Sequence, residues 1–197
     1  MKFEREYPRT AESKGWSWTL RAMERSDRDA LLALAHSIPE HDQLFLRRDI
    51  TRPEVVDRWI DELEAGELAT VLAERDGAID GYATVQPDRD TWSPHVAELR
   101  VHVAPGQRGR GLGRILTQEA FALALSAGIE KITARMTPDQ RSALRTFEGL
   151  GFRAEGLLRD YVKDRTGQMH DLLVLSHDVA RFHAMLEAYG VVDALGD

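Results

Sequence analysis

The stretch from Val101 to Glu119 constrains the fold of this chain more than any other part. It reads VHVAPGQRGRGLGRILTQE, an alternating β-branched run that stops at Pro105 and passes into a glycine-rich turn. Glycine occupies every second position of that turn, at 109, 111 and 113, and apolar residues then recur at helical spacing. The pattern therefore predicts a strand that runs through a glycine turn directly into the N-terminus of a helix.

Such a turn is suited to bind an anion. The first turn of a helix leaves backbone N–H groups without partners, and the helix dipole places about half a positive charge there. Arg108, Arg110 and Arg114 crowd the same turn, and glycine lets a ligand approach the backbone closely. We therefore expect a seat for a phosphate or pyrophosphate group. The alternative is purely structural, because glycine turns also join strands to helices without a ligand.

The spacing of the glycines argues against two nucleotide-binding motifs. A P-loop requires Lys and then Ser or Thr after its glycines, and Arg114 and Ile115 stand there instead. A Rossmann fingerprint spaces its glycines G-x-G-x-x-G at the start of a βαβ unit. Here the spacing is G-x-G-x-G, and it begins at Gly109, far into the chain.

Composition bounds the class of protein. A chain of 197 residues fits one domain, and the absence of cysteine excludes disulfides, zinc-thiolate sites and a cysteine nucleophile. No apolar run approaches the roughly 20 residues of a membrane span, and the N-terminus lacks the apolar core of a secretory signal. We therefore expect a cytoplasmic protein with no membrane partner.

The charge is acidic and unevenly distributed. A net charge of -7 argues against a nucleic-acid partner, because phosphate backbones need a basic footprint. Residues 24–90 hold 17 Asp and Glu residues against 8 Arg and no Lys. An acidic first half beside an arginine-rich turn suggests a cationic partner that meets an anionic cofactor; a solvated acidic surface is the alternative.

Hydrophobic periodicity and turn residues predict one mixed α/β domain. Residues 1–15 show no period and are predicted to be a flexible leader, and residues 179–197 are predicted to be a C-terminal helical extension that covers a sheet edge or a homodimer partner. The expected strands span 16–23, 68–74, 78–85, 96–103, 131–136, 152–162 and 169–177, and the expected helices begin near residues 27, 53, 112 and 140.

The segment from Arg108 to Gly113 matches the R/Q-x-x-G-x-G/A acyl-CoA motif, and the chain resembles the GNAT superfamily of N-acyltransferases. The strand end Val-x-Val-x-Pro, the helix that ends Phe-x-x-x-Gly-Phe, and the closing hairpin occur in the family's order. The resemblance covers about residues 16–178. It implies a mixed, mostly antiparallel twisted sheet, flanked by helices, in which strand 96–103 splays from strand 131–136.

The resemblance also implies an acetyl-CoA site without a metal. Main-chain groups of the motif strand would hold the pantetheine arm as an added strand would. N–H groups of the glycine turn would hold the pyrophosphate, and Gln140 stands where many relatives place a cofactor-binding asparagine, although it equally suits a helix start. The implied cofactor-binding residues are Val101, His102, Val103, Arg108, Gly109, Arg110, Gly111, Leu112, Gly113, Gln140 and Phe147.

The catalytic residues are predicted from the chemistry of acyl transfer. An alkylamine titrates near ~10.4, so a base must take its proton at neutral pH. Some family members use a glutamate in this region as general base, so the resemblance makes Glu98 on the motif strand the first candidate, with a surface charge paired to Arg100 as the alternative. Many relatives have a tyrosine acid where Phe147 stands, and Tyr161 is the nearest substitute, unless it is only a packed aromatic.

The prediction for function is an N-acetyltransferase. It would transfer an acetyl or short acyl group from acyl-CoA to a primary amine by direct attack in a ternary complex. The acceptor would be a small-molecule amine or a protein N-terminus. A catalytically silent CoA-binding sensor or interaction module of the same fold is the alternative, and Phe147 in place of tyrosine favours it.

Overall fold

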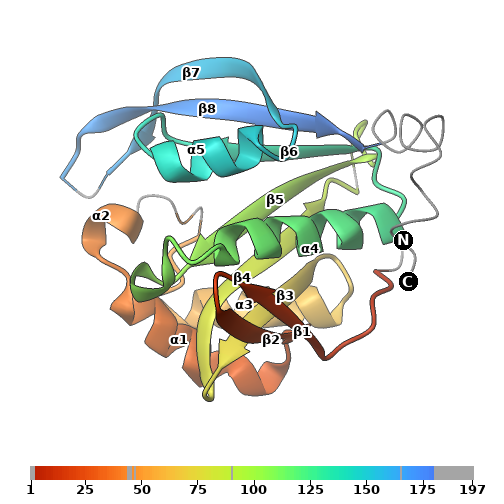
Figure 1. Cartoon of the computed structure of the whole chain (residues 1–197). Helices are drawn as coiled ribbons and strands as arrows, with labels where there is room; N and C mark the ends of the chain where they lie inside the picture. Colours follow the sequence, from red (N-terminus) through yellow and green to blue (C-terminus); the bar gives the residue numbers. More distant parts are fainter. Residues whose placement is uncertain (1–2, 44–45, 47, 90, 165, 180–197) are drawn as a thin grey trace.

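The computed structural model describes residues 3–43, 46, 48–89, 91–164 and 166–179 (Figure 1). Its helices and strands follow the predicted order closely. They are β1 (Arg9–Ser13), β2 (Trp16–Ala22), α1 (Arg28–Ser37), α2 (Glu40–Gln43), α3 (Pro53–Glu64), β3 (Ala69–Arg75), β4 (Ala78–Pro87), β5 (Val96–Val103), α4 (Leu112–Ser126), β6 (Lys131–Met136), α5 (Arg141–Glu148), β7 (Arg153–Lys163) and β8 (Met169–Asp178).

The strands form one eight-stranded sheet in the order β1-β2-β3-β4-β5-β6-β8-β7. Every neighbouring pair is antiparallel except β5 and β6, which are parallel and joined through α4. A parallel pair requires a crossover, and α4 supplies it. The expected single domain with a mixed, mostly antiparallel sheet is therefore confirmed.

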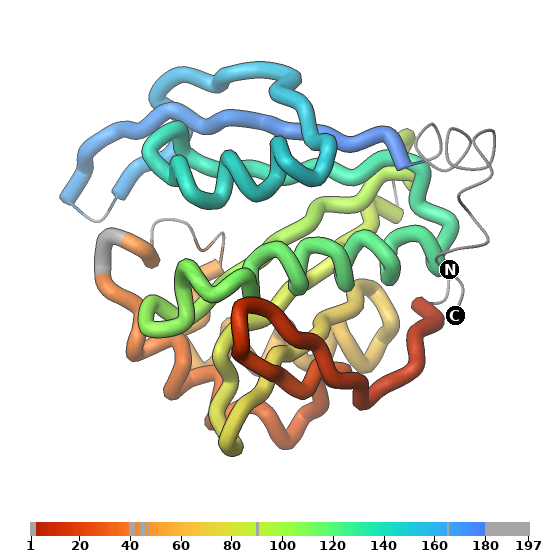
Figure 2. Tube along the Cα trace, in the orientation of Figure 1, coloured from red at the N-terminus to blue at the C-terminus, as the bar shows by residue number. Residues whose placement is uncertain are grey.

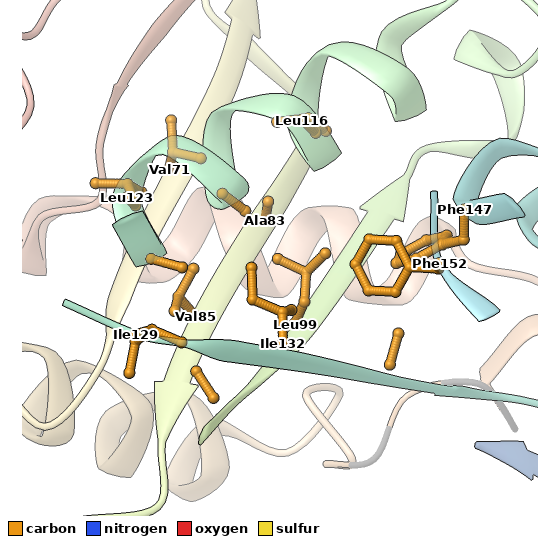
Figure 3. Close-up of a cluster of buried hydrophobic side chains, with 14 of the residues drawn as sticks. Val71, Ala83, Val85, Leu99, Leu116, Leu123, Ile129, Ile132, Phe147 and Phe152 are labelled. Carbon is orange, nitrogen blue, oxygen red and sulfur yellow. The ribbon is translucent and has the colours of Figure 1, made fainter. Parts of the chain in front are cut away.

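Both faces of the central strands are buried. Alternate residues of β3 and β4, such as Val71 and Ala83, pack with Leu116 of α4 in one core (Figure 3). The residues between them, such as Leu72 and Tyr82, pack with α1 and α3 in a second core. Strands covered on both sides read as continuous apolar runs, and β4 is buried over almost its whole length for this reason.

The parallel pair β5–β6 is short. Only three register pairs join it, and the last of them, Glu98 with Thr133, marks the point where the two strands separate. The hydroxyl of Thr133 donates to the carbonyl of Ala97 at 3.4 Å beside that last pair. Beyond it β6 continues with β8, whereas β5 continues with β4 (Figure 1). The predicted splay is therefore present, and its fork lies at Glu98.

The prediction of a flexible leader is wrong for residues 9–13. These residues form β1 and pair along their whole length with β2. The strand RTAES has no apolar alternation because it lies at the sheet edge, where both its faces are largely exposed. Residues 180–197 of the predicted C-terminal extension lie outside the described residues, and only Val179, which is buried, belongs to the described part. No helix in the described ranges is long and apolar enough to cross a membrane.

Candidate active site

A large cleft opens at the fork of the sheet. Its volume is about 1460 Å³, which exceeds the roughly 300–1,000 Å³ that suits one drug-sized ligand. The glycine turn and the start of α4 form one wall, α5 and the β7–β8 hairpin form another, and the loop between α2 and α3 closes the end. The cleft is therefore larger than one such ligand requires.

The glycine turn presents the N-terminus of α4 to this cleft. Gly109 and Gly111 have φ values of 78° and 94°, in the left-handed region, and Gly111 is the N-cap residue of α4. Leu112 is buried in the core beneath the turn, at 1% exposure, and fixes the helix start. Gly111, Gly113 and Arg114 at the start of α4 line the cleft, so the helix N-terminus borders it, as an anion seat requires.

The three arginines of the turn differ in their roles. Arg108 lines the cleft and donates to Asp42 at 2.8 Å, which ties the turn to α2. Arg110 stacks its guanidinium on the ring of Trp16 at 3.6 Å and does not line the cleft. Arg114 is exposed on the first turn of α4 and lines the cleft. Arg108 and Arg114 are therefore placed to meet an anion, whereas Arg110 supports the turn from outside.

Glu98 and Arg100 lie on the face of β5 opposite α4. Glu98 is 13% exposed, lines the cleft, and accepts a hydrogen bond from Arg100 Nε at 3.2 Å. Arg100 also donates to Gln86 Oε1 at 2.8 Å. Since Glu98 is the last residue of β5 paired with β6, the structure places a carboxylate at the vertex of the split sheet. The ion pair with Arg100 is present as well, so both interpretations of Glu98 have a structural basis.

His102 lies on the same face as Glu98 and forms part of an aromatic wall. Its ring stacks against Tyr82 with centroids 5.7 Å apart, and Tyr82 stacks against Trp59 at 5.0 Å. Burial, with the nearby Arg108 guanidinium, lowers the pKa of His102 to about 4, against a smaller opposing effect of Asp42. Its Nε2 atom is buried and has no hydrogen-bond partner among the described residues. His102 is therefore a neutral imidazole on the cleft wall at neutral pH.

Gln140 and Phe147 border the cleft from the α5 side. Gln140 is the N-cap residue of α5, and its side-chain oxygen accepts from the backbone N–H of Thr137 at 3.3 Å. Phe147 is buried and packs edge to face on Phe152, with ring centroids 4.9 Å apart (Figure 3). Phe147 also lines the cleft. Gln140 therefore has a structural role at the start of α5. Phe147 forms part of the cleft wall, and its side chain has no proton to donate.

Tyr161 comes from β7 on the far side of the cleft. Its side chain is 58% exposed, so it is not a packed core aromatic. The ladder between β7 and β8 is irregular from Leu158 to Val162, and Asp160 has a φ of 51° in this irregular segment. A bulge of this kind redirects a side chain, and here Tyr161 lines the cleft.

Several cleft residues were not predicted. Lys14, in the turn between β1 and β2, lies beside the glycine turn. Arg48 lines the cleft from the loop before α3 and donates to Gln86 of β4 at 3.5 Å. The turn residues Lys14-Gly15 between two alternating stretches are a hairpin signal that would have placed Lys14. No local pattern marks Arg48, because its position depends on the long-range packing of α3 against β4.

The acidic segment 24–90 has many of its carboxylates in ion pairs. Its carboxylates are used mainly in ion pairs on and between the helices that cover the sheet, such as Arg25 with Glu64 at 2.6 Å and Arg28 with Asp57. Arg48, which lines the cleft, pairs with Glu62 of α3 at 2.6 Å. The solvated, ion-paired surface therefore accounts for most of the acidity. Within the described ranges, no group of three or more His, Asp or Glu side chains is placed to hold a metal ion.

Comparisons with known proteins identify the class to which this fold and cleft belong, the acetyltransferases. The model of the acetyltransferase (GNAT) family matches residues 32–152, which is more than half of the chain. The chain therefore belongs to the GNAT family, and the predicted resemblance is confirmed.

Three individual relatives share less than a third of their residues with this chain over the matched regions. YwnH of Bacillus subtilis, provisionally named as a phosphinothricin acetyltransferase, is 24% identical over 164 residues, which cover 82% of this chain and 99% of YwnH. Streptothricin acetyltransferase of Streptomyces lavendulae is 29% identical over 94 residues, 48% of this chain and 49% of that protein. Among solved structures, yncA of Salmonella typhimurium, an acetyltransferase by its provisional name that was solved with its cofactor acetyl-CoA, matches with a TM-score of 0.68 at 20% identity. The match covers 82% of this chain and 94% of the yncA chain.

Proposed function

We propose that this protein transfers an acetyl or short acyl group from acyl-CoA to a primary amine by direct attack within a ternary complex. The observation that carries the proposal is the position of Glu98 at the fork of β5 and β6, inside a cleft that the glycine turn borders. The names of the relatives, which refer to acetylation of phosphinothricin and streptothricin, support a small-molecule amine as the acceptor, and a protein N-terminus is the other candidate.

The donor would lie between the splayed strands. Residues 99–103 of β5 have no register pair with β6, so their backbone groups on that side can pair with the amides of the pantetheine arm near Val101 and Val103. The pyrophosphate would accept from N–H groups between Arg108 and Gly113, with Arg108 and Arg114 as counter-charges. The side chain of Gln140 and the ring of Phe147 would border the arm from the α5 side.

Acyl transfer then requires three events at the fork. The amine nitrogen attacks the thioester carbonyl carbon as Glu98, directly or through water, takes the amine proton. A backbone N–H of β5 near Val101 stabilises the oxyanion of the tetrahedral intermediate. The C–S bond breaks, and the thiolate takes a proton from the Tyr161 hydroxyl or from water. No cysteine is available to carry the acyl group, which agrees with direct transfer.

One assay tests this function. The purified protein is incubated with acetyl-CoA and a panel of primary amines, and released CoA is followed with a thiol reagent. Because the chain contains no cysteine, every thiol detected comes from CoA. Turnover with at least one amine, and initial-rate lines that intersect rather than run parallel, would support the ternary-complex proposal. The Gly111→Glu variant, which places a negative side chain in the anion seat, serves as the inactive control.

A second candidate function rests on Phe147. Its benzyl ring cannot donate a proton, and it stands on the α5 wall of the cleft. A module that binds acyl-CoA without turnover would show thermal stabilisation by CoA and no thiol release with any amine. Absence of stabilisation by CoA would contradict both functions.

A further inference from the structure

The N-terminal hairpin of β1 and β2 reaches the glycine turn (Figure 2). The two strands pair over five residues, and their turn is formed by Lys14 and Gly15, both with positive φ. The Lys14 ammonium group donates to the carbonyl oxygen of Gly109 at 2.8 Å. Lys14 also lines the cleft, on the same wall as Gly109 and Gly111. We propose that Lys14 binds a phosphate group of the acyl-CoA, and that the hairpin is a built part of the cofactor site.

The hairpin is held in place by a buried carboxylate. Glu119, on α4, is 5% exposed and accepts hydrogen bonds from Arg5 Nε at 2.7 Å and from the Tyr7 hydroxyl at 2.9 Å. Arg9 Nη1 adds a longer contact to Glu119 at 3.5 Å. The segment before β1 is thereby fixed to the helix whose N-terminus forms the anion seat. The position of Lys14 is therefore set by ion pairs and hydrogen bonds and is not a chance surface position.

The contact of the hairpin with the glycine turn is close. A Cβ atom on Gly111 would stand 2.1 Å from the hydroxyl oxygen of Ser13, so the side chain next to Lys14 fills the space that glycine leaves. Trp16, which follows the Lys14–Gly15 turn in the sequence, packs against the guanidinium of Arg110, which lies 3.6 Å from the centre of the Trp16 ring. The hairpin therefore contacts the turn on both sides of Lys14.

The chemistry of Lys14 suits a phosphate. A lysine ammonium carries three N–H donors, and the bond to Gly109 uses one of them. Among the described residues Lys14 has no carboxylate partner, whereas Arg108, on the same wall, is paired with Asp42. The carbonyl of Gly109 fixes the position of this ammonium group, and no carboxylate in the described part of the chain neutralises its charge. The group can therefore bind an anion through its charge and its remaining N–H donors. This inference rests on the proposed function, because it assumes acyl-CoA in the cleft.

The test compares dissociation constants of CoA for matched variants. Lys14→Gln removes the charge and keeps most of the side-chain length, and Lys14→Arg keeps the charge. Lys131→Gln is the control, since Lys131 is also a partly exposed lysine, pairs with Glu155 at 3.0 Å, and does not line the cleft. We expect Lys14→Gln to weaken CoA binding about tenfold and to flatten its dependence on salt, because one charge-assisted contact is lost. Lys14→Arg and Lys131→Gln should stay within about twofold of the unchanged protein, since both keep the cation at the site.

Dephospho-CoA, which lacks the 3′-phosphate, identifies the phosphate involved. An equal loss with CoA and dephospho-CoA supports a contact to the pyrophosphate, which the proximity to Gly109 favours. A loss with CoA alone supports a contact to the 3′-phosphate. Unchanged CoA binding in Lys14→Gln, with an unchanged midpoint of thermal unfolding, would overturn the role of Lys14 and leave the proposed function intact. Failure of the unchanged protein to bind CoA would overturn both.

Discussion

The hydroxyl oxygen of Ser13 lies 2.1 Å from the place where a Cβ atom on Gly111 would stand. Glycine at this position of the motif is therefore required by the contact with the hairpin. Gly111 also has a φ of 94°, which any residue with a side chain adopts at a cost.

Gly109 offers a matched comparison for the first prediction. It has a φ of 78°, and a Cβ atom added there would meet nothing within 4 Å. We expect Gly109→Ala to lower the free energy of unfolding by about 1–2 kcal/mol, from backbone strain alone. Gly111→Ala should lose about 1–3 kcal/mol more, because Ser13 must move. Urea unfolding of both variants checks this, and equal losses would show that Ser13 does not limit this position.

The second prediction concerns Glu98 as the base. Glu98→Gln keeps the size and removes the proton acceptor, so turnover should fall by about 10²-fold or more. The dissociation constant of CoA should change little, since the anion seat lies at the other end of β5. Glu155→Gln, which removes an exposed carboxylate outside the cleft, is the control for general charge effects. Turnover of Glu98→Gln that matches the unchanged protein between pH 6 and 9 would exclude Glu98 as base.

The third prediction concerns the proton for the leaving thiolate. Tyr161→Phe removes only the hydroxyl, and the exposure of this side chain makes a loss of folding stability small. If the hydroxyl protonates the thiolate, kcat should fall on the order of 10²-fold, with unchanged binding of CoA. Steady-state kinetics with the best acceptor of the panel would measure it. An unchanged kcat would assign the proton to water, because a thiol with a pKa near ~8.5 is a tolerable leaving group without an acid.

The fourth prediction follows from the pKa of His102. Folding lowers this pKa from its ordinary value of 6.5 to about 4, so between these values the unfolded chain binds a proton that the folded chain does not. The stability present above pH 6.5 should therefore be lost as the pH falls toward 4, by up to about 1.4 kcal/mol per pH unit. His102→Gln should lack this part of the slope in urea unfolding at pH 7.0, 5.5 and 4.5. Parallel pH dependences of the two proteins would contradict the lowered pKa.

Much of the fold could be predicted from local sequence patterns. Helices such as α3 and strands such as β3 have strong periodicity, and Pro53 and Gly77 mark the expected boundaries. The motif from Arg108 to Gly113 identified the family. The backbone conformation of this turn requires glycine, and a glycine requirement is visible in the sequence. The splay of strand 96–103 from strand 131–136 was implied by the resemblance, but its start at Glu98 was not, since nothing in the strand itself marks where its pairing with β6 ends.

The remainder depended on contacts between distant segments. β1 lies at the sheet edge, and a polar edge strand shows no alternation that could distinguish it from a loop. Lys14 reaches the glycine turn across 95 residues of sequence, and Arg48 meets Gln86 across 38. Contacts between residues so far apart in the sequence depend on how the whole sheet packs. No local sequence pattern therefore predicts Lys14 or Arg48 as cleft residues.

The short ladder between β5 and β6 has a consequence for how sequences of this kind diverge. The open edge of β5 consists of backbone N–H and C=O groups, which every non-proline residue supplies alike. A donor held mainly by such groups places little demand on side-chain identity along that strand. Apart from Glu98, the side chains of β5 on the α3 side and those of the loop before α3 are then free to change with the acceptor, which agrees with a shared fold at only 20% identity.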